Sequence, residues 1–254
     1  MNLRLLAGSA LAAFGILGFV ACSSSDDSTF GKENQDQPDT GTVLPGFGVE
    51  AGAEGGDGGG ARDCKVAIPD SFQPKWTPPA ASQKVCDDQQ IGDYYKACLQ
   101  GAWASAACQA FIKSAATCAA CLDTQDTAAK LGPVVWRLDH GYYNINIPGC
   151  IALVQNDSTD KGCGAAYESF LHCDRAACSA CFQKGDSTAQ FEAFQKCQQQ
   201  AGAVGLCDTL NQQRGQTCGD LTAPDAGGTQ VCLPASGETL LDVYTRTAKL
   251  FCNK

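Results

Sequence analysis

Apolar residues recur at three-to-five-residue steps in four stretches of the chain, and this spacing predicts helices. These stretches are residues 103–122, 163–182, 188–203 and 238–251. Residues 82–99 are also expected to be helical, because they are rich in Gln, Lys, Asp and Ala. The predicted fold class is mainly α, with disulfide-rich helical hairpins or a bundle after a disordered tether.

Three other stretches lack helical periodicity. Residues 64–81 contain four prolines and are expected to form an extended segment laid over the domain. Residues 131–154 mix aliphatic and aromatic residues, which favours short strands or an ordered loop. Residues 219–237 are expected to form another loop.

Residues 22–63 are expected to be a disordered tether, because their Gly, Asp, Ser and Thr cannot bury enough apolar surface to offset chain entropy. This segment has nine acidic residues against Lys32 and Arg62, so it holds most of the formal net charge of −9. Residues 64–254, the expected folded domain, are nearly balanced in charge. Neither part has the basic stripe that nucleic-acid binding requires, so no nucleic-acid partner is expected.

The N-terminal segment combines a short basic start, an apolar run over residues 5–20 and then Cys22. The sequence Phe19-Val20-Ala21-Cys22 resembles the lipobox of bacterial lipoprotein signal peptides. The alternatives are a plain cleaved secretory signal, with Ala21 at the cleavage site, and a membrane-spanning helix. A spanning helix needs about 20 apolar residues, and this run is shorter.

The lipobox resemblance implies that residues 1–21 are removed as a signal peptide and that Cys22 becomes the lipidated N-terminus. Acyl chains such as palmitate would then anchor the protein, since each buried methylene contributes about 0.8 kcal/mol. In enteric lipoproteins an Asp after the cysteine favours the inner membrane, and Ser23 stands there instead. The expected location is therefore the cell envelope, with the outer membrane favoured over the inner.

Sixteen of the seventeen cysteines lie in residues 64–254, an even number that suits a disulfide framework in an oxidising compartment. Several are ten residues apart, which spans about 15 Å of helix. Bridged Cα atoms are only about 4.4–6.8 Å apart, so such pairs must find partners on another helix.

Antiparallel hairpins supply these partners. A break at Lys184-Gly185-Asp186, with Ser187 as cap, predicts Cys173–Cys197 and Cys163–Cys207. A break near Gly101-Ala102 predicts Cys98–Cys108 and Cys86–Cys118. The possible halves of the domain are thus residues 82–122 and 163–207. The second hairpin resembles the twin C-x9-C pattern of coiled-coil-helix–coiled-coil-helix proteins, a likeness of architecture that carries no function with it.

Two C-x-x-C motifs, Cys118/Cys121 and Cys178/Cys181, are the recurring motifs with possible chemistry. Structural disulfides are the favoured interpretation. A four-thiolate zinc site would have an unusually long spacer, and a thioredoxin-like pair would need a βαβ unit that is not visible. No metal or other cofactor is therefore expected.

Other candidate sites are weaker. The two histidines, His140 and His172, do not suggest a catalytic triad, and no catalytic residue is predicted. The stretch from Asp157 to Gly162, with Glu168, mimics part of a calcium loop. Lys161 stands where an oxygen ligand is needed, so a helix-capping role is preferred.

The aromatic residues Trp136, Tyr142 and Tyr143 are the candidate recognition residues, because Trp and Tyr combine apolar area with a polar tip. A position in the core is the alternative, and it is the preferred one.

The function predicted from these features is a membrane-anchored, disulfide-stabilised structural or binding module of the cell envelope. Its expected partners are the membrane, through lipid on Cys22, and an unidentified envelope or extracellular partner. The plan of lipobox, tether and cysteine-rich domain resembles uncharacterised lipoproteins of myxobacteria and their relatives. The alternative is a secreted thiol–disulfide oxidoreductase or another envelope enzyme.

Overall fold

The computed structural model describes residues 47–49, 64–100, 103–137, 141–182, 188–223 and 227–253, and the described part is mainly helical. The α-helices are α1 (Asp88–Tyr94), α2 (Ala106–Ser114), α3 (Ala116–Leu122), α4 (Ile147–Val154), α5 (Cys163–Ala177), α6 (Thr188–Ala203), α7 (Asp208–Cys218) and α8 (Leu240–Cys252). A π-helical turn, η1 (Tyr95–Leu99), continues α1, and two 3₁₀ turns are η2 (Ser179–Cys181) and η3 (Thr229–Cys232). The strands are β1 (Phe47–Val49), β2 (Asp123–Gln125), β3 (Val134–Arg137) and β4 (Tyr142–Ile145).

The predicted helices are present with shifted ends. Helix α6 has the predicted bounds, whereas the helix expected over residues 103–122 is two helices that meet at Ala115. Helix α8 begins one residue after Thr239, whose side chain caps it in a capping box with Asp242. The apolar pattern did not predict α4 or α7, because α4 is buried on nearly all sides and α7 has no buried side chain.

The strands form one sheet in the order β1-β4-β3-β2, with β3 and β4 as an antiparallel hairpin. Residues 131–154 thus contain two of the short strands expected there, followed by α4. Strand β1 pairs with β4 and lies inside the segment expected to be a disordered tether, so that prediction is wrong at Phe47–Val49. Phe and Val favour strands, and the edge of β4 offers unpaired backbone groups.

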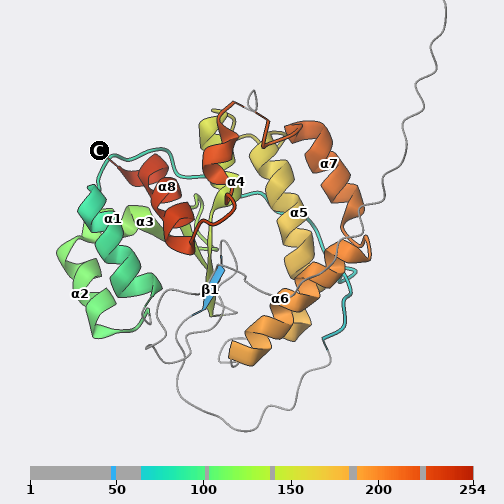
Figure 1. The fold of residues 1–254 in the computed structure, drawn as a ribbon, viewed down its shortest axis with the longest axis horizontal. Helices are drawn as coiled ribbons and strands as arrows, with labels where there is room; N and C mark the ends of the chain where they lie inside the picture. Colours follow the sequence, from blue (N-terminus) through green and yellow to red (C-terminus); the bar gives the residue numbers. More distant parts are fainter. Residues whose placement is uncertain are drawn as a thin grey trace, which may run out of the picture.

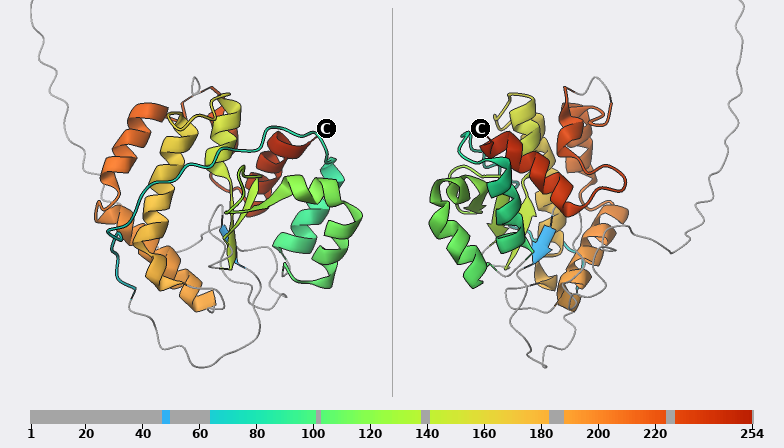
Figure 2. Two further views of the ribbon diagram at one scale, coloured as in Figure 1. Left: turned by 180° about the vertical axis from the view of Figure 1, so that it is seen from behind. Right: turned by 60° about the vertical axis from the view of Figure 1, so that its left-hand side comes forward.

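The sheet lies between two groups of helices (Figures 1 and 2). Alternate residues of a strand point to opposite faces, so the strands contribute side chains to both faces of the sheet. Val134, Trp136 and Tyr143 belong to a cluster with residues of α1, α3, α4 and α8. Tyr142 belongs to a second cluster with Phe191 and other residues of α6 and the end of α5.

Residues 64–81, which we call the strap, are extended as expected and cross the domain beside α5 and α4 (Figure 2, left). Backbone hydrogen bonds hold the strap at several points. Ala67 N–H donates to Ala177 O, and Ala80 N–H donates to Leu131 O at 2.8 Å. The indole N–H of Trp76 donates to Ser158 O at 3.1 Å.

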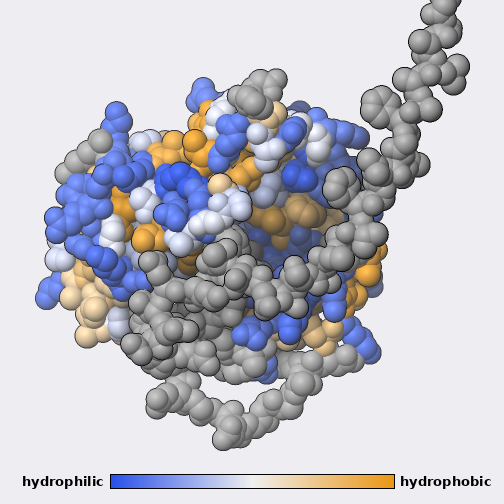
Figure 3. Space-filling view, in the orientation of Figure 1, coloured by the Kyte–Doolittle hydropathy of each residue, from blue (hydrophilic) through white to orange (hydrophobic). Residues whose placement is uncertain are grey.

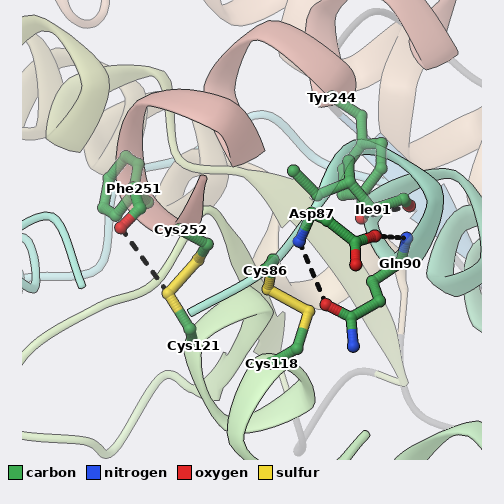
Figure 4. Close-up of a disulfide and its surroundings, with 9 residues drawn as sticks. All are labelled: Cys86, Asp87, Gln90, Ile91, Cys118, Cys121, Tyr244, Phe251 and Cys252. Carbon is green, nitrogen blue, oxygen red and sulfur yellow. Dashed lines mark hydrogen bonds between the residues drawn. A yellow bond between two sulfur atoms is a disulfide. The ribbon is translucent and has the colours of Figure 1, made fainter. Parts of the chain in front are cut away.

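Eight disulfides join the sixteen cysteines of residues 64–253. They are Cys64–Cys181, Cys86–Cys118, Cys98–Cys108, Cys121–Cys252, Cys150–Cys232, Cys163–Cys218, Cys173–Cys207 and Cys178–Cys197. Cys86–Cys118 and Cys98–Cys108 are the pairs predicted for the first hairpin. Figure 4 shows how Cys118 and Cys121, on α3, tie this helix to the segment before α1 and to the end of α8.

The two pairs predicted for the second hairpin, Cys163–Cys207 and Cys173–Cys197, are wrong. Cys173 bonds to Cys207, and the partner of Cys197 is Cys178. The physical reason is that the partners lie on elements that a symmetric hairpin does not include. Cys178, directly after α5, bonds to Cys197 of α6, whereas Cys207 directly precedes α7 and bonds to Cys173 of α5. The break at residues 184–186 and the Ser187 cap lie outside the described residues.

The predicted partner of Cys163, Cys207, is wrong because α7 supplies the partner instead. It stands at the start of α5, whereas its partner Cys218 stands at the end of α7. Helix α7 packs antiparallel along α5, and the sequence pattern had not predicted that helix.

Candidate functional site

Two adjoining hollows of about 250 Å³ each lie between the strap, the turn after β2, the end of β3 and α5. Both are lined by Asp126, Arg137 and His172. The first is also lined by Lys75, Thr77, Thr127, Leu131 and Glu168. The second is also lined by Tyr142, Arg175, Ala176, Ser179 and Phe194. We call the two hollows together the charged cavity.

The backbone of two elements directs the charged side chains into this cavity. On α5, Glu168, His172 and Arg175 are spaced by four and three residues, which places them on one face of the helix. On β3, Arg137 lies opposite Tyr142 of β4, on the sheet face turned away from Trp136. The same sheet face therefore presents Arg137 to the side chains of α5.

Glu168 is shared by two arginines. Its Oε1 accepts a hydrogen bond from Nη2 of Arg175 and lies 3.5 Å from Nη2 of Arg137. Asp126 is a more distant partner, 4.0 Å from Nη1 of Arg137. The Nε of Arg137 donates to Asn144 Oδ1 at 2.9 Å. Two guanidinium groups are thus held close together around one carboxylate oxygen.

Burial strengthens the interactions between these charges, because little water screens them. Arg175 is 7% exposed. Burial, followed by the nearby charge of Arg175, lowers the pKa of Arg137 from its usual value, although an arginine remains charged at neutral pH. Among the described residues, the side chain of Arg175 makes one hydrogen bond, and its acceptor is Glu168. The guanidinium of Arg175 therefore has further N–H donors for the cavity it lines.

His172 connects the cavity to the strap. Its Nδ1 accepts a hydrogen bond from the backbone N–H of Lys75 at 3.3 Å, and its ring packs edge-on against Phe72. Burial, with the positive charge of Arg175 next in importance, lowers the pKa of His172 from 6.5 to about 4. The imidazole is therefore neutral at pH 7, and acceptance at Nδ1 leaves the proton on Nε2.

The polar groups of the lining are mainly hydrogen-bond donors. The cavity offers guanidinium, imidazole and hydroxyl donors, and its two carboxylates already face arginines. Among the described residues, no hydrogen bond joins His172 to a lining hydroxyl such as that of Ser179.

The candidate recognition residues do not form a surface. Trp136, Tyr142 and Tyr143 are 4%, 2% and 1% exposed, so they belong to the core. Trp136 packs against Trp103 and Tyr143. Tyr142 packs against phenylalanines of the second cluster, and it also lines the charged cavity.

Neither C-x-x-C motif is bonded within itself. Each of the four cysteines is bonded to a distant residue: Cys118 to Cys86, Cys121 to Cys252, Cys178 to Cys197 and Cys181 to Cys64. The sulfurs of Cys64, Cys181 and Cys197 lie within 4.8 Å of one another. Because each belongs to a disulfide, none offers the thiolate that a zinc ion binds.

The calcium-like stretch does not assemble as a loop around an ion. Asp157 Oδ1 accepts from the backbone and hydroxyl of Thr159, at 3.0 and 2.7 Å. Glu168, the expected last ligand, faces the arginines instead. Gly162 precedes the first residue of α5, but no side chain caps this helix.

Sequence reasoning did not single out Asp126, Arg137 or Arg175. The spacing of Glu168, His172 and Arg175 within the predicted helix 163–182 could have indicated a polar stripe. The contribution of Arg137 required knowledge of the strand pairing. Two earlier candidates, Cys22 and His140, lie outside the described residues.

No family model, curated protein or solved structure matches this chain. In the part of the chain that the structure describes, no helix has the length and apolar character needed to cross a membrane.

Proposed function

We propose that this protein is a lipid-anchored binding module of the cell envelope, in which a disulfide-stapled helical domain presents the charged cavity to a ligand. In this proposal Cys22 carries the lipid, and Ser23 after it favours the outer membrane. The domain binds and does not catalyse.

The pairing of all sixteen cysteines of residues 64–253 is the observation that carries the proposal. Stable disulfides in this number are typical of an oxidising compartment outside the cytoplasm, which supports the proposed location. The remaining cysteine is Cys22, which follows the apolar run of a lipobox-like sequence. The disulfide framework of residues 64–253 thus leaves out the one cysteine that the lipobox resemblance assigns to lipidation, and this supports the proposal.

The oxidoreductase alternative has less support. A catalytic C-x-x-C pair alternates between a dithiol and an internal disulfide. Here the cysteines of both motifs cross-link separate segments, and all four are at most 2% exposed. Reducing either motif would detach structural elements from each other.

The test is to express the full chain in a Gram-negative host with labelled palmitate, beside a Cys22→Ser variant. We expect label and detergent-phase partitioning in the wild type, and neither in Cys22→Ser. We also expect no titratable thiol in the denatured, unreduced mature protein. An unlabelled wild type would overturn the anchoring, and several free thiols would overturn the oxidised module.

A further inference from the structure

The charged cavity contains more positive charge than its carboxylates neutralise. Arg137, Arg175 and Lys75 line it, against Asp126 and Glu168. One oxygen of Glu168 is divided between both arginines, and Asp126 is 4.0 Å from Arg137, beyond hydrogen-bond distance. A buried guanidinium whose donors are not all matched favours an additional anionic partner.

The other polar groups of the lining are also mainly donors. The neutral ring of His172 has its acceptor nitrogen engaged by Lys75 N–H, so Nε2–H is the free side of the imidazole. Thr77 adds a hydroxyl group to the first hollow, and Ser179 adds one to the second. A ligand that presents several oxygen acceptors matches this set, whereas a cation would meet the two arginines.

The volume of each hollow and its apolar lining restrict the ligand further. Each hollow is about 250 Å³, below the range of roughly 300–1,000 Å³ typical of pockets for drug-sized molecules. Tyr142 and Phe194 give the second hollow an apolar part next to Arg175. A small organic anion with a short carbon skeleton fits this combination.

We propose that the charged cavity binds a small soluble oxyanion, a carboxylate or a phosphate, in the second hollow, which Arg137 and Arg175 both line. Both side chains present planar N–H forks, which suit the paired oxygens of these groups. The inference deepens the proposed function, because it names the ligand class of the same module.

The experiment uses the full oxidised chain in detergent micelles, with glutarate and inorganic phosphate as probes and glycerol as the neutral control. Isothermal titration calorimetry measures the affinity for each. We expect saturable binding of at least one anion, no glycerol binding, and a loss of affinity as sodium chloride is raised to 0.5 M. No binding of either anion at millimolar concentrations would overturn the inference.

Variants locate the site. Arg175→Gln and Arg137→Gln are each expected to weaken anion binding at least tenfold. Lys113→Gln is the matched control, because it makes the same change in net charge on the exposed face of α2 and should not affect binding. Arg175→Lys keeps the charge but loses the fork, so it should bind between wild type and Arg175→Gln. Equal binding by all variants would place the anion elsewhere and refute the inference.

Folding and function are separated by two controls. Each variant is accepted only with the wild-type helical circular dichroism and no free thiol. If Arg175→Gln fails this check, Arg175→Lys and the salt dependence still decide the question. A lipidated, fully oxidised chain that binds no anion would refute this inference alone, whereas free thiols would refute the proposed function.

Discussion

Glu168 is the residue on which the charges of the cavity depend. Its side chain and those of Arg137 and Arg175 are between 8% and 16% exposed, so their charges interact in a medium of low polarity. Removing one member of such a group lowers the folding stability by more than the intact group contributes to it. The reason is that the remaining charges stay buried without a partner. The two arginines would then repel each other across the space that Glu168 now fills.

Glu168→Gln is therefore expected to lower the free energy of unfolding by about 2–4 kcal/mol, measured by urea denaturation of the oxidised chain. Asp93→Asn is the matched control, since this carboxylate on α1 is exposed and its loss should change stability by less than about 0.5 kcal/mol. Equal stability of the two variants would show that Glu168 does not neutralise the arginines.

His172 makes stability depend on pH. Its pKa is about 4 in the folded protein, below the ordinary value of 6.5, so between these values the unfolded chain binds a proton that the folded chain does not. The contribution to stability is thus complete above about pH 6.5, and it is lost as the pH falls toward 4. Asp123 and Asp174 act in the opposite direction, because burial raises their pKa values to about 6.

His172→Asn isolates the histidine, since the amide oxygen can accept the Lys75 N–H and does not titrate. Between pH 7 and pH 4 the wild type should lose roughly 1–2 kcal/mol more unfolding free energy than the variant, after allowance for partial exposure. Urea titrations at both pH values measure this, and the aspartate contributions cancel in the difference. Parallel pH curves would contradict the assignment.

At the scale of elements, the disulfides determine how α5, α6 and α7 pack. Cys178–Cys197 and Cys173–Cys207 tie α5 to α6 and to the start of α7, and Cys163–Cys218 ties the far ends of α5 and α7. Arg214 of α7 packs over the rings of Tyr167 and Phe170, so side-chain contacts support the same arrangement. The helices thus pack in a register that the cysteine spacing alone does not determine.

Unreduced tryptic peptides distinguish this pairing from the twin C-x9-C pattern. Cleavage after Arg175 and Lys184 releases residues 176–184, and cleavage after Lys196 and Arg214 releases residues 197–214. We expect mass spectrometry to find these two peptides in one cross-linked species, joined through Cys178–Cys197, which also contains residues 162–175 attached through Cys173–Cys207. The digest is made on denatured protein with thiols blocked, to prevent exchange. Residues 197–214 joined to 162–175 alone would contradict the structure.

On the scale of the whole molecule, disulfides hold together a fold with two separate apolar clusters. The sheet divides the clusters, and twelve of the sixteen paired cysteines are buried within them. Cys64–Cys181 fastens the start of the strap to the second cluster, while Cys86–Cys118 fastens the chain beyond the strap to the first. Cross-links between distant segments reduce the entropy of the unfolded chain, which stabilises the fold.

Complete reduction is therefore expected to unfold the domain at 37 °C. Each disulfide contributes about 2–4 kcal/mol, whereas the net stability of a domain is only about 5–15 kcal/mol. Circular dichroism of reduced and alkylated protein should show loss of most helical signal, and alkylation without reduction should leave it unchanged. A reduced chain with native helicity would show that apolar packing suffices without the cross-links.

The fold class and most helices were predictable, because amphipathic spacing is a local property of the chain. Helix α6 was predicted to the residue, and the local bridge Cys98–Cys108 followed from a short turn. Helix α7 was not predictable in this way, since all its side chains are at least partly exposed and no apolar stripe marks it. Without α7, Cys163 had no correct partner to be assigned.

The charged cavity was predictable only in part. The stripe of Glu168, His172 and Arg175 depends on helical spacing, whereas Arg137 reaches it through the register of β3 and β4. Trp136 and Arg137 are neighbours in sequence, but they lie on opposite faces of the sheet. Whether an aromatic residue becomes surface or core depends on what covers each face, which is a long-range property.

By itself, the sequence determined the helical class, the even set of cysteines and the extended strap, because these follow from composition and local spacing. The tertiary structure decided which cysteines pair in the second half of the domain, which aromatic residues are buried and where the two arginines meet. The reason is physical: helix formation depends on neighbours along the chain, whereas disulfides and buried charges depend on residues brought together from distant segments.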